Sequence, residues 1–216
     1  MKQTAEIGGR GSLSRRLILE AALRLIDADG VEGLSMRRLA SELGVFPTAL
    51  YYYLPNKDAL IRGVVGLVLA RIELPDHGLG WGERLRKLAL AFRRVVRPHP
   101  RLLPQLVAYP ETTLEEYGVY EALYDALEEA GLGPVEIVRA STLLFSYVTG
   151  FTLAEANGTL GPLTRAERDD LDALPPEEFR ATRRLAPQIS AFDLDADFEF
   201  GIDAIIFSLA AKAERG

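Results

Sequence analysis

The sequence predicts an all-α protein of about nine or ten helices, with a small N-terminal three-helix head, a linking helix and a larger helical body. Apolar residues recur at helical spacing, caps and glycine stops bracket these stretches, and none shows the alternation typical of strands. The chain has 216 residues, 48% of them hydrophobic and 26% charged, which is enough for a small and a larger domain. We divide it into a flexible tail (1–12), a head (13–60) and a body (61–216).

Two helices of the head are bracketed by clear start and stop signals. Ser14 is a favourable N-cap for the first helix, and Gly30 supplies its stop. Ser35 begins a second, short helix that ends at Gly44. We therefore expect both helices to lie between these residues.

The third helix and the linking helix follow directly. Pro47 suits the first position of a helix, because its missing N–H would be unpaired there, and this helix is expected to stop at Leu54. Asn56 caps the linking helix, which begins at 57 and is expected to run to about Glu73. The glycine-rich residues 75–82 then separate the head from the rest of the body.

The body continues the helical pattern. Residues 157–194 are acidic and contain prolines, and we expect one or two short helices there. Asp195 is the expected cap of the last helix, whose apolar seam comprises Phe198, Ile202, Ile205 and Leu209. The other expected body helices cover residues 84–97, 102–108, 113–131 and 134–156.

Composition narrows the class of protein. The chain has no cysteine, which excludes disulfides and thiol chemistry, and no signal peptide is visible, so we expect a cytoplasmic protein without a membrane span. The net charge of −6 does not exclude a nucleic-acid partner, because residues 1–60 hold eight basic and seven acidic groups and the excess of acid lies in the body. Binding to DNA requires a local positive surface rather than a positive total.

The segment 36–54 fits a helix-turn-helix. Ala40 is small enough for the point where two helices cross, Gly44 suits the tight turn, and Val45 and Leu50 fill a small core. A second helix held rigidly at a steep angle to the first can enter the major groove of DNA. Taken alone, this pattern would also fit other compact three-helix units.

Residues 39–60 resemble the signature of the TetR family of transcriptional regulators, above all in Leu50-Tyr51 followed by Asn56-Lys57-Asp58. The stretch 123–155 looks like the tetracycline-repressor-like branch. The resemblance implies a DNA-binding head on a ligand-binding and dimerisation body. It further implies a homodimer that binds palindromic double-stranded operator DNA, most simply as a repressor, and that an unidentified small-molecule effector releases.

The same resemblance assigns DNA contacts to eight residues of the head. They are Arg37, Pro47, Thr48, Ala49, Tyr51, Tyr52, Tyr53 and Lys57. Independently, three consecutive tyrosines cannot all face a small core, because neighbouring residues on a helix lie about 100° apart. Many family members carry Ser or Thr at the position of Phe46 and Thr at the position of Ala49, so the individual contacts are expected to differ here.

For the body, the resemblance implies dimerisation through the helices over 134–156 and 195–212, as a four-helix interface. Candidate ligand-binding residues combine apolar and polar character. They are Phe92, His99, Tyr109, Tyr117, Phe145 and Thr149. Tetracycline-binding relatives use histidines late in the fourth helix and in the sixth. The matching stretches 71–73 and 101–103 have none, so we predict neither a tetracycline–magnesium complex nor any metal or cofactor.

Three alternative functions remain open at this point. An all-helical enzyme is disfavoured, because the two histidines, His77 and His99, lie apart in sequence and no hydrolase, zinc-protease or phosphate-loop motif occurs. A helical ligand-binding dimer that has lost DNA binding is compatible with Phe46 and Ala49. An activator of the same fold cannot be distinguished from a repressor by sequence.

Overall fold

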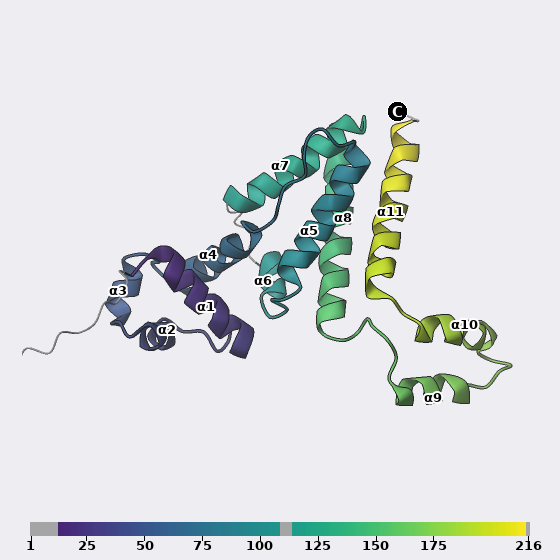
Figure 1. Ribbon diagram of the computed structural model, residues 1–216, viewed down its shortest axis with the longest axis horizontal. Coiled ribbons are helices and arrows are strands. Elements are labelled where there is room, and N and C mark those ends of the chain that lie inside the picture. Colours follow the sequence, from purple (N-terminus) through teal and green to yellow (C-terminus); the bar gives the residue numbers. More distant parts are fainter. Residues whose placement is uncertain (1–12, 109–113, 215–216) are drawn as a thin grey trace, which may run out of the picture.

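The computed structural model describes residues 13–108 and 114–214, and in these ranges it contains eleven α-helices and no strand. The molecule is elongated, with a small helical head at one end, a helical body in the middle and a projecting pair of helices at the other end (Figure 1). The all-α prediction is confirmed. The helices are α1 (Arg15–Asp29), α2 (Met36–Leu43), α3 (Pro47–Tyr51), α4 (Lys57–Leu69), α5 (Trp81–Val96), α6 (Leu103–Ala108), α7 (Leu114–Glu129), α8 (Pro134–Ala156), α9 (Arg165–Ala173), α10 (Arg180–Ser190) and α11 (Leu194–Ala213).

The predicted caps of the head helices are present. The Ser14 hydroxyl accepts a hydrogen bond from the backbone N–H of Leu17 at 3.2 Å, and the Ser35 hydroxyl accepts one from Arg38 at the same distance. Asn56 caps α4 through a 2.8 Å bond from the backbone N–H of Ala59. These bonds fix where α1, α2 and α4 begin, and α1 then packs against both α2 and α4.

Two head helices end earlier than the sequence predicts. α3 ends at Tyr51 rather than Leu54, since the backbone N–H groups of Tyr53 and Leu54 both turn back to the carbonyl of Leu50. α4 ends at Leu69 rather than near Glu73, and residues 70–72 close it in a tighter turn. The apolar pattern continues past Leu69 because Ile72 still packs into the core, so the pattern overestimates the helix.

The body is built around α5, α7, α8 and α11, which pack side by side. Arg93 on α5 joins three of these helices from a nearly fully buried position. Its guanidinium donates two hydrogen bonds to Glu155 on α8, at 2.9 and 3.0 Å, and forms an ion pair with Asp195 on α11 at 2.8 Å. It also lies 4.7 Å from the ring centre of Phe198, so electrostatic and cation–π contacts fix the body helices together.

The last helix begins differently from the prediction. Asp193, not Asp195, is the N-cap of α11, because its carboxylate accepts hydrogen bonds from the backbone N–H groups of Asp195 and Ala196 at 3.0 and 3.2 Å. The N-cap is therefore two residues earlier than expected, which leaves the Asp195 carboxylate available for Arg93. From sequence alone, Asp193 and Asp195 are equally suitable N-cap residues, and only the hydrogen bonds identify which of them caps α11.

α8 is the one helix of the described residues with the length and apolar character of a membrane span. Its buried residues include Ile137, Leu144 and Val148, and the helix packs against α5, α7 and α11. Five serine and threonine side chains reduce its apolar character, and Thr149 and Thr152 bond back to its own carbonyls. It is a central helix of the body, as the sequence predicts.

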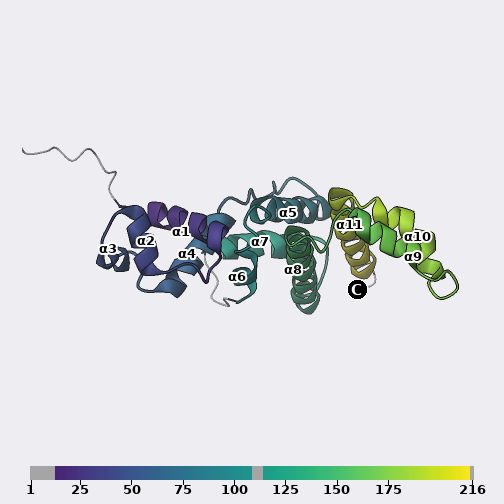
Figure 2. The ribbon, with the colours of Figure 1, turned by 90° about the horizontal axis from the view of Figure 1, so that it is seen from below.

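α9 and α10 form an arm that extends away from the body, next to the start of α11 (Figures 1 and 2). The two helices pack on each other, and neither contains a buried residue. Phe179, Leu185 and Ile189 are exposed on this arm. The acidic segment thus forms two helices, and with them the described helices number eleven rather than nine or ten.

Candidate nucleic-acid interface and ligand cavity

α2 and α3 form the helix-turn-helix that the sequence predicts. Ala40 is buried in α2 near the crossing point, and its carbonyl accepts a 2.9 Å hydrogen bond from the N–H of Val45 in the turn. Gly44 adopts φ +64°, a left-handed conformation that favours glycine. Leu50 on α3 is fully buried. The short α3 is therefore held rigidly at the end of the head that is farthest from the arm (Figure 2).

The three tyrosines divide between solvent and protein. Tyr52 is 87% exposed and Tyr51 is 49% exposed, whereas Tyr53 is half-buried. The Tyr53 hydroxyl donates a 2.7 Å hydrogen bond to the backbone carbonyl of Leu13, which ties α3 to the start of α1. The prediction that at least one tyrosine is exposed is confirmed, and two are.

The cationic side chains of the head also divide. Arg37 on α2 is exposed and makes no hydrogen bond or ion pair to any residue in the described ranges. Arg38 is engaged within the head, because it donates to the Gly33 carbonyl at 3.1 Å and pairs with Asp29. Arg37 is therefore the better placed of the two to meet a ligand.

Lys57, at the start of α4, also has a partner within the head. Its ammonium donates a 2.7 Å hydrogen bond to the Val31 carbonyl in the loop between α1 and α2. An ammonium has three donors, so two remain for a further acceptor. The bond brings the loop and the N-terminus of α4 together and adds a structural role to the one predicted from the resemblance.

The start of α3 completes the exposed end of the head. Thr48 is exposed, while Pro47 and Ala49 are half-buried. Phe46 is 82% exposed and provides no side-chain cap for α3, as expected from a residue without a hydrogen-bonding group. We define the head surface as Arg37, Thr48, Tyr51 and Tyr52. It offers hydroxyl groups and a guanidinium to an anionic partner.

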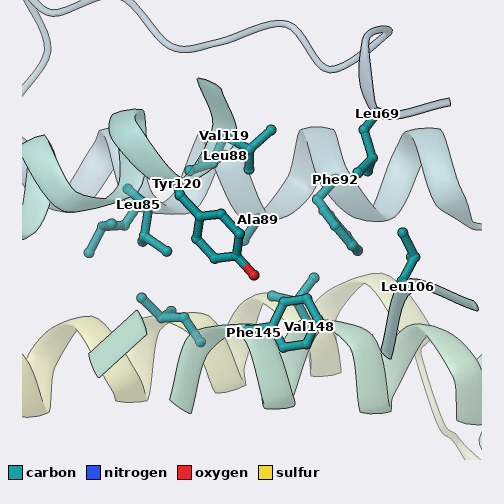
Figure 3. Close-up of a pocket in the computed structure, with 12 residues that line it drawn as sticks. Leu69, Leu85, Leu88, Ala89, Phe92, Leu106, Val119, Tyr120, Phe145 and Val148 are labelled. Atoms are coloured by element: carbon teal, nitrogen blue, oxygen red, sulfur yellow. The ribbon is translucent and has the colours of Figure 1, made fainter. Parts of the chain in front are cut away.

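A cavity of about 70 Å³ lies in the body between α4, α5, α6, α7 and α8 (Figure 3). Twelve side chains surround it and none of them is charged. They are Leu69, Leu85, Leu88, Ala89, Phe92, Leu106, Val119, Tyr120, Leu123, Leu144, Phe145 and Val148. The hydroxyl of Tyr120 points between the two walls and is the one polar side-chain group among them (Figure 3). Such a cavity suits an apolar, uncharged molecule.

Two of the six residues selected from sequence as ligand contacts, Phe92 and Phe145, line this cavity. Thr149 does not, because it is buried on α8 with its hydroxyl donating to the Phe145 carbonyl at 2.6 Å. Tyr117 is 61% exposed, and Tyr109 lies outside the described residues. His99 is placed elsewhere, in a contact with Asp27 of α1.

Sequence reasoning missed the remaining lining residues, most notably Tyr120. Tyr120 and Leu123 are three residues apart on α7, with Val119 beside them, which is the spacing of one helical face. A search for a tyrosine on the inward face of that helix would have selected Tyr120. Leu69 also lines the cavity, and it is the last residue of α4. The cavity is therefore in contact with the helix that leads to the head.

α8 and α11 present an apolar face to solvent. On α11, Phe200 and Phe207 are 75% and 76% exposed, and on α8, Val135 and Val138 are 58% and 61% exposed. The predicted seam of α11 packs inward, since Phe198, Ile202 and Leu209 are buried in the chain's own body. Phe200 and Phe207 therefore lie on a second face of α11, outside this seam.

α8 and α11 are held firmly where they cross. A Cβ on Gly201 would lie 2.0 Å from the Tyr147 hydroxyl, so only glycine permits this approach. The hydroxyl donates to the Phe198 carbonyl at 3.0 Å. Burial raises the pKa of Tyr147. The exposed apolar face thus rests on a rigid pair of helices.

Two family models match most of the chain. Residues 18–64 match the model described as bacterial regulatory proteins, tetR family, and residues 74–213 match the tetracyclin repressor-like, C-terminal domain. The boundary between the two matches falls in the segment between α4 and α5.

Three individual proteins are also similar to this chain. An HTH-type transcriptional regulator of Saccharopolyspora erythraea is 31% identical over 145 residues, which are 67% of this chain and 61% of that protein, so the chain spans about three fifths of this relative. The tetracycline repressor protein class D of Escherichia coli is 29% identical over 90% of this chain and 88% of its own length. The crystal structure of the Streptomyces coelicolor TetR family protein ActR in complex with actinorhodin superposes with a TM-score of 0.81 at 29% identity, covering 94% of this chain and 99% of ActR.

Proposed function

The chain belongs to the tetR family of bacterial regulatory proteins, and we propose that it is a ligand-responsive transcriptional repressor that binds a palindromic operator as a homodimer. The observation that carries this proposal is the head surface: a rigid helix-turn-helix presents two exposed tyrosines, a threonine and an exposed arginine at the tip of the molecule. A protein of this function acts in the cytoplasm, on double-stranded DNA.

In this function α3 enters the major groove with Pro47, Thr48 and Ala49 at its leading end. Tyr51 and Tyr52 bond the phosphate backbone or touch a thymine methyl, and Arg37 reaches a guanine edge or a phosphate. Lys57 adds a phosphate contact through the donors that Val31 leaves available, aided by the positive end of the α4 dipole. Tyr53 acts by holding α3 on α1.

The homodimer forms through α8 and α11. Exposed phenyl groups on α11 and branched side chains on α8 supply the apolar area that a permanent interface buries. A two-fold axis through these helices gives four helices at the interface and places two heads on the same side of the dimer. The two heads then bind half-sites that lie about one turn of the DNA helix apart, and two-fold symmetry requires the operator to be palindromic.

The effector is a largely apolar aromatic compound whose uncharged ring system occupies the cavity between α5, α7 and α8. Its lining has two phenyl rings, one hydroxyl and no charge to pair with an ionised ligand. ActR, which shares this fold, is seen with actinorhodin and with (S)-DNPA. These complexes support a similar class of ligand for this chain.

The size of the cavity makes ligand binding a conformational event. A cavity of about 70 Å³ is smaller than the roughly 150 Å³ cavity known to hold benzene. An aromatic effector therefore has to displace a wall, and Leu69 at the end of α4 is part of that wall. Movement of α4 changes the spacing of the two heads, and the effector lowers operator affinity to the extent that it binds the displaced state more tightly.

Selection of binding sites from a pool of random duplexes tests the DNA-binding part of the proposal. We expect the selected sites to be palindromic, and binding to engage two chains per duplex. Recovery of non-palindromic sequences with one chain bound would contradict the dimeric repressor.

A variant that fills the cavity tests the effector part. Ala89→Val adds two methyl groups to the lining, which fill part of the cavity without requiring a wall to move. We expect this variant to retain operator binding but to lose release by actinorhodin, used as the first probe. Ala173→Val, on the exposed end of α9, is the matched control. Release of Ala89→Val at the wild-type concentration of probe would show that the effector binds elsewhere.

A further inference from the structure

A polar cluster joins the head to the body at a place that the ligand cavity does not include. His99, in the turn between α5 and α6, approaches both carboxylate oxygens of Asp27 on α1, with Nδ1 at 2.9 and 3.0 Å. Arg101, two residues on, donates to the backbone carbonyls of Ala28 and, at 3.3 Å, Asp27. None of these residues lines the cavity.

Arg101 supplies hydrogen-bond donors to backbone carbonyls at the C-terminal end of α1. The last carbonyls of a helix lack partners within the helix and carry the negative end of its dipole. α1 has no basic residue in its last turn, and its C-terminal glycine bonds back to Ile26. A guanidinium from 73 residues further along the chain therefore caps the head's first helix from the body side.

His99 is held in a defined orientation. Its backbone N–H bonds to the Val96 carbonyl at 2.8 Å, and its side chain is only 12% exposed. The guanidinium Nη1 of Arg71, a residue just after α4, lies 3.4 Å from Nε2 of His99. A neutral ring protonated at Nδ1 satisfies both contacts, since Nδ1 then donates to Asp27 and Nε2 accepts from Arg71.

We propose that His99 and Arg101 are positioning residues that fix the orientation of the head on the body through α1, a connection separate from α4. The same turn leads directly into α6, where Leu106 lines the cavity. A ligand that displaces α6 would therefore move the turn and, with it, α1. This last step rests on the proposed function, whereas the positioning role does not.

A distance measurement between the head and the body tests the positioning role without DNA or ligand. Because the sequence has no cysteine, spin labels can be placed through Glu42→Cys on α2 and Glu128→Cys on α7, both exposed. Labelled chains are diluted with unlabelled chains, so that an assembly carries one labelled copy. We expect His99→Ala and Arg101→Ala to broaden or shift the distance distribution, and Arg101→Lys, which keeps a cationic donor, to restore part of it.

The matched control is Arg94→Ala. Arg94 pairs with Glu73 at 3.0 Å, also between α5 and the segment after α4, and in the part of the chain that the structure describes no hydrogen bond or ion pair joins it to α1. We expect the control to keep the wild-type distribution, and circular dichroism to show that all variants retain their helices. Wild-type distributions in both His99→Ala and Arg101→Ala would overturn the proposal.

A second readout connects the cluster to operator binding. The discrimination ratio is the affinity for a selected palindrome divided by the affinity for the same palindrome with two base pairs added at its centre. This ratio should be large when the heads are held rigidly, because the added pairs change the spacing of the two half-sites. We expect Arg101→Ala to lower this discrimination ratio, while Arg94→Ala leaves it unchanged. Should the wild-type protein bind no DNA, the proposed function fails and the label distances still decide the positioning role.

Discussion

Removal of single hydroxyl groups from adjacent tyrosines separates the DNA-facing role from the structural one. Tyr51→Phe removes a hydroxyl that has no hydrogen-bond partner among the described residues and that sits on a 49% exposed side chain. We therefore expect no loss of stability. A hydrogen bond to a charged group contributes about 1.5–3 kcal/mol, so the loss of a phosphate contact should weaken binding about 10- to 150-fold for each half-site.

Tyr53→Phe should have the opposite profile. Its hydroxyl donates to the Leu13 carbonyl in the free protein, and loss of this bond should lower the free energy of unfolding by about 1 kcal/mol. Operator affinity should change much less than in Tyr51→Phe. Fluorescence anisotropy with a labelled duplex and urea denaturation measure the two quantities in parallel. Full affinity in Tyr51→Phe, together with lost affinity in Tyr53→Phe, would refute this assignment.

Three further predictions concern the body. Glu155→Gln breaks the buried pair with the α5 guanidinium and should lower the free energy of unfolding by about 3 kcal/mol, whereas Glu20→Gln in an exposed i,i+4 pair should leave the urea midpoint unchanged; equal effects would contradict the buried role. Burial raises the pKa of Tyr147, so the free energy of unfolding should be at its full value below pH 10 and fall as the pH rises above it. Tyr147→Phe should reduce that fall in urea titrations at several pH values. An identical pH profile in the variant would show that Tyr147 does not cause the fall. Phe207→Glu should yield monomers in light scattering, while Phe46→Glu on the head should not; a dimeric Phe207→Glu would remove α11 from the interface.

Much of the head could be predicted from sequence because its signals are local. Ser14, Ser35 and Asn56 act on backbone groups three residues away, and Gly44 supplies a conformation that few other residues adopt. Such signals do not depend on the rest of the fold. The ends of α3 and α4 were missed because continued burial, rather than continued helix, maintains the apolar pattern there.

The ligand cavity could be predicted only in part because its members come from five helices that are distant in sequence. Phe92 and Phe145 are among the candidates from sequence, but Leu69 and Leu106 have no local feature that marks them. His99 is another of these candidates, and its partner in the structure lies 72 positions away on α1. Pairings over such distances follow from helix packing, which a single sequence does not reveal.

We propose that the head surface recognises an operator as one half of a two-fold pair. The affinity of the protein for a selected palindromic duplex can be compared with its affinity for the same bases in scrambled order, at one salt concentration. We expect tighter binding to the palindrome by roughly 10³-fold or more, with two chains per duplex. Equal affinity for the two duplexes would contradict it.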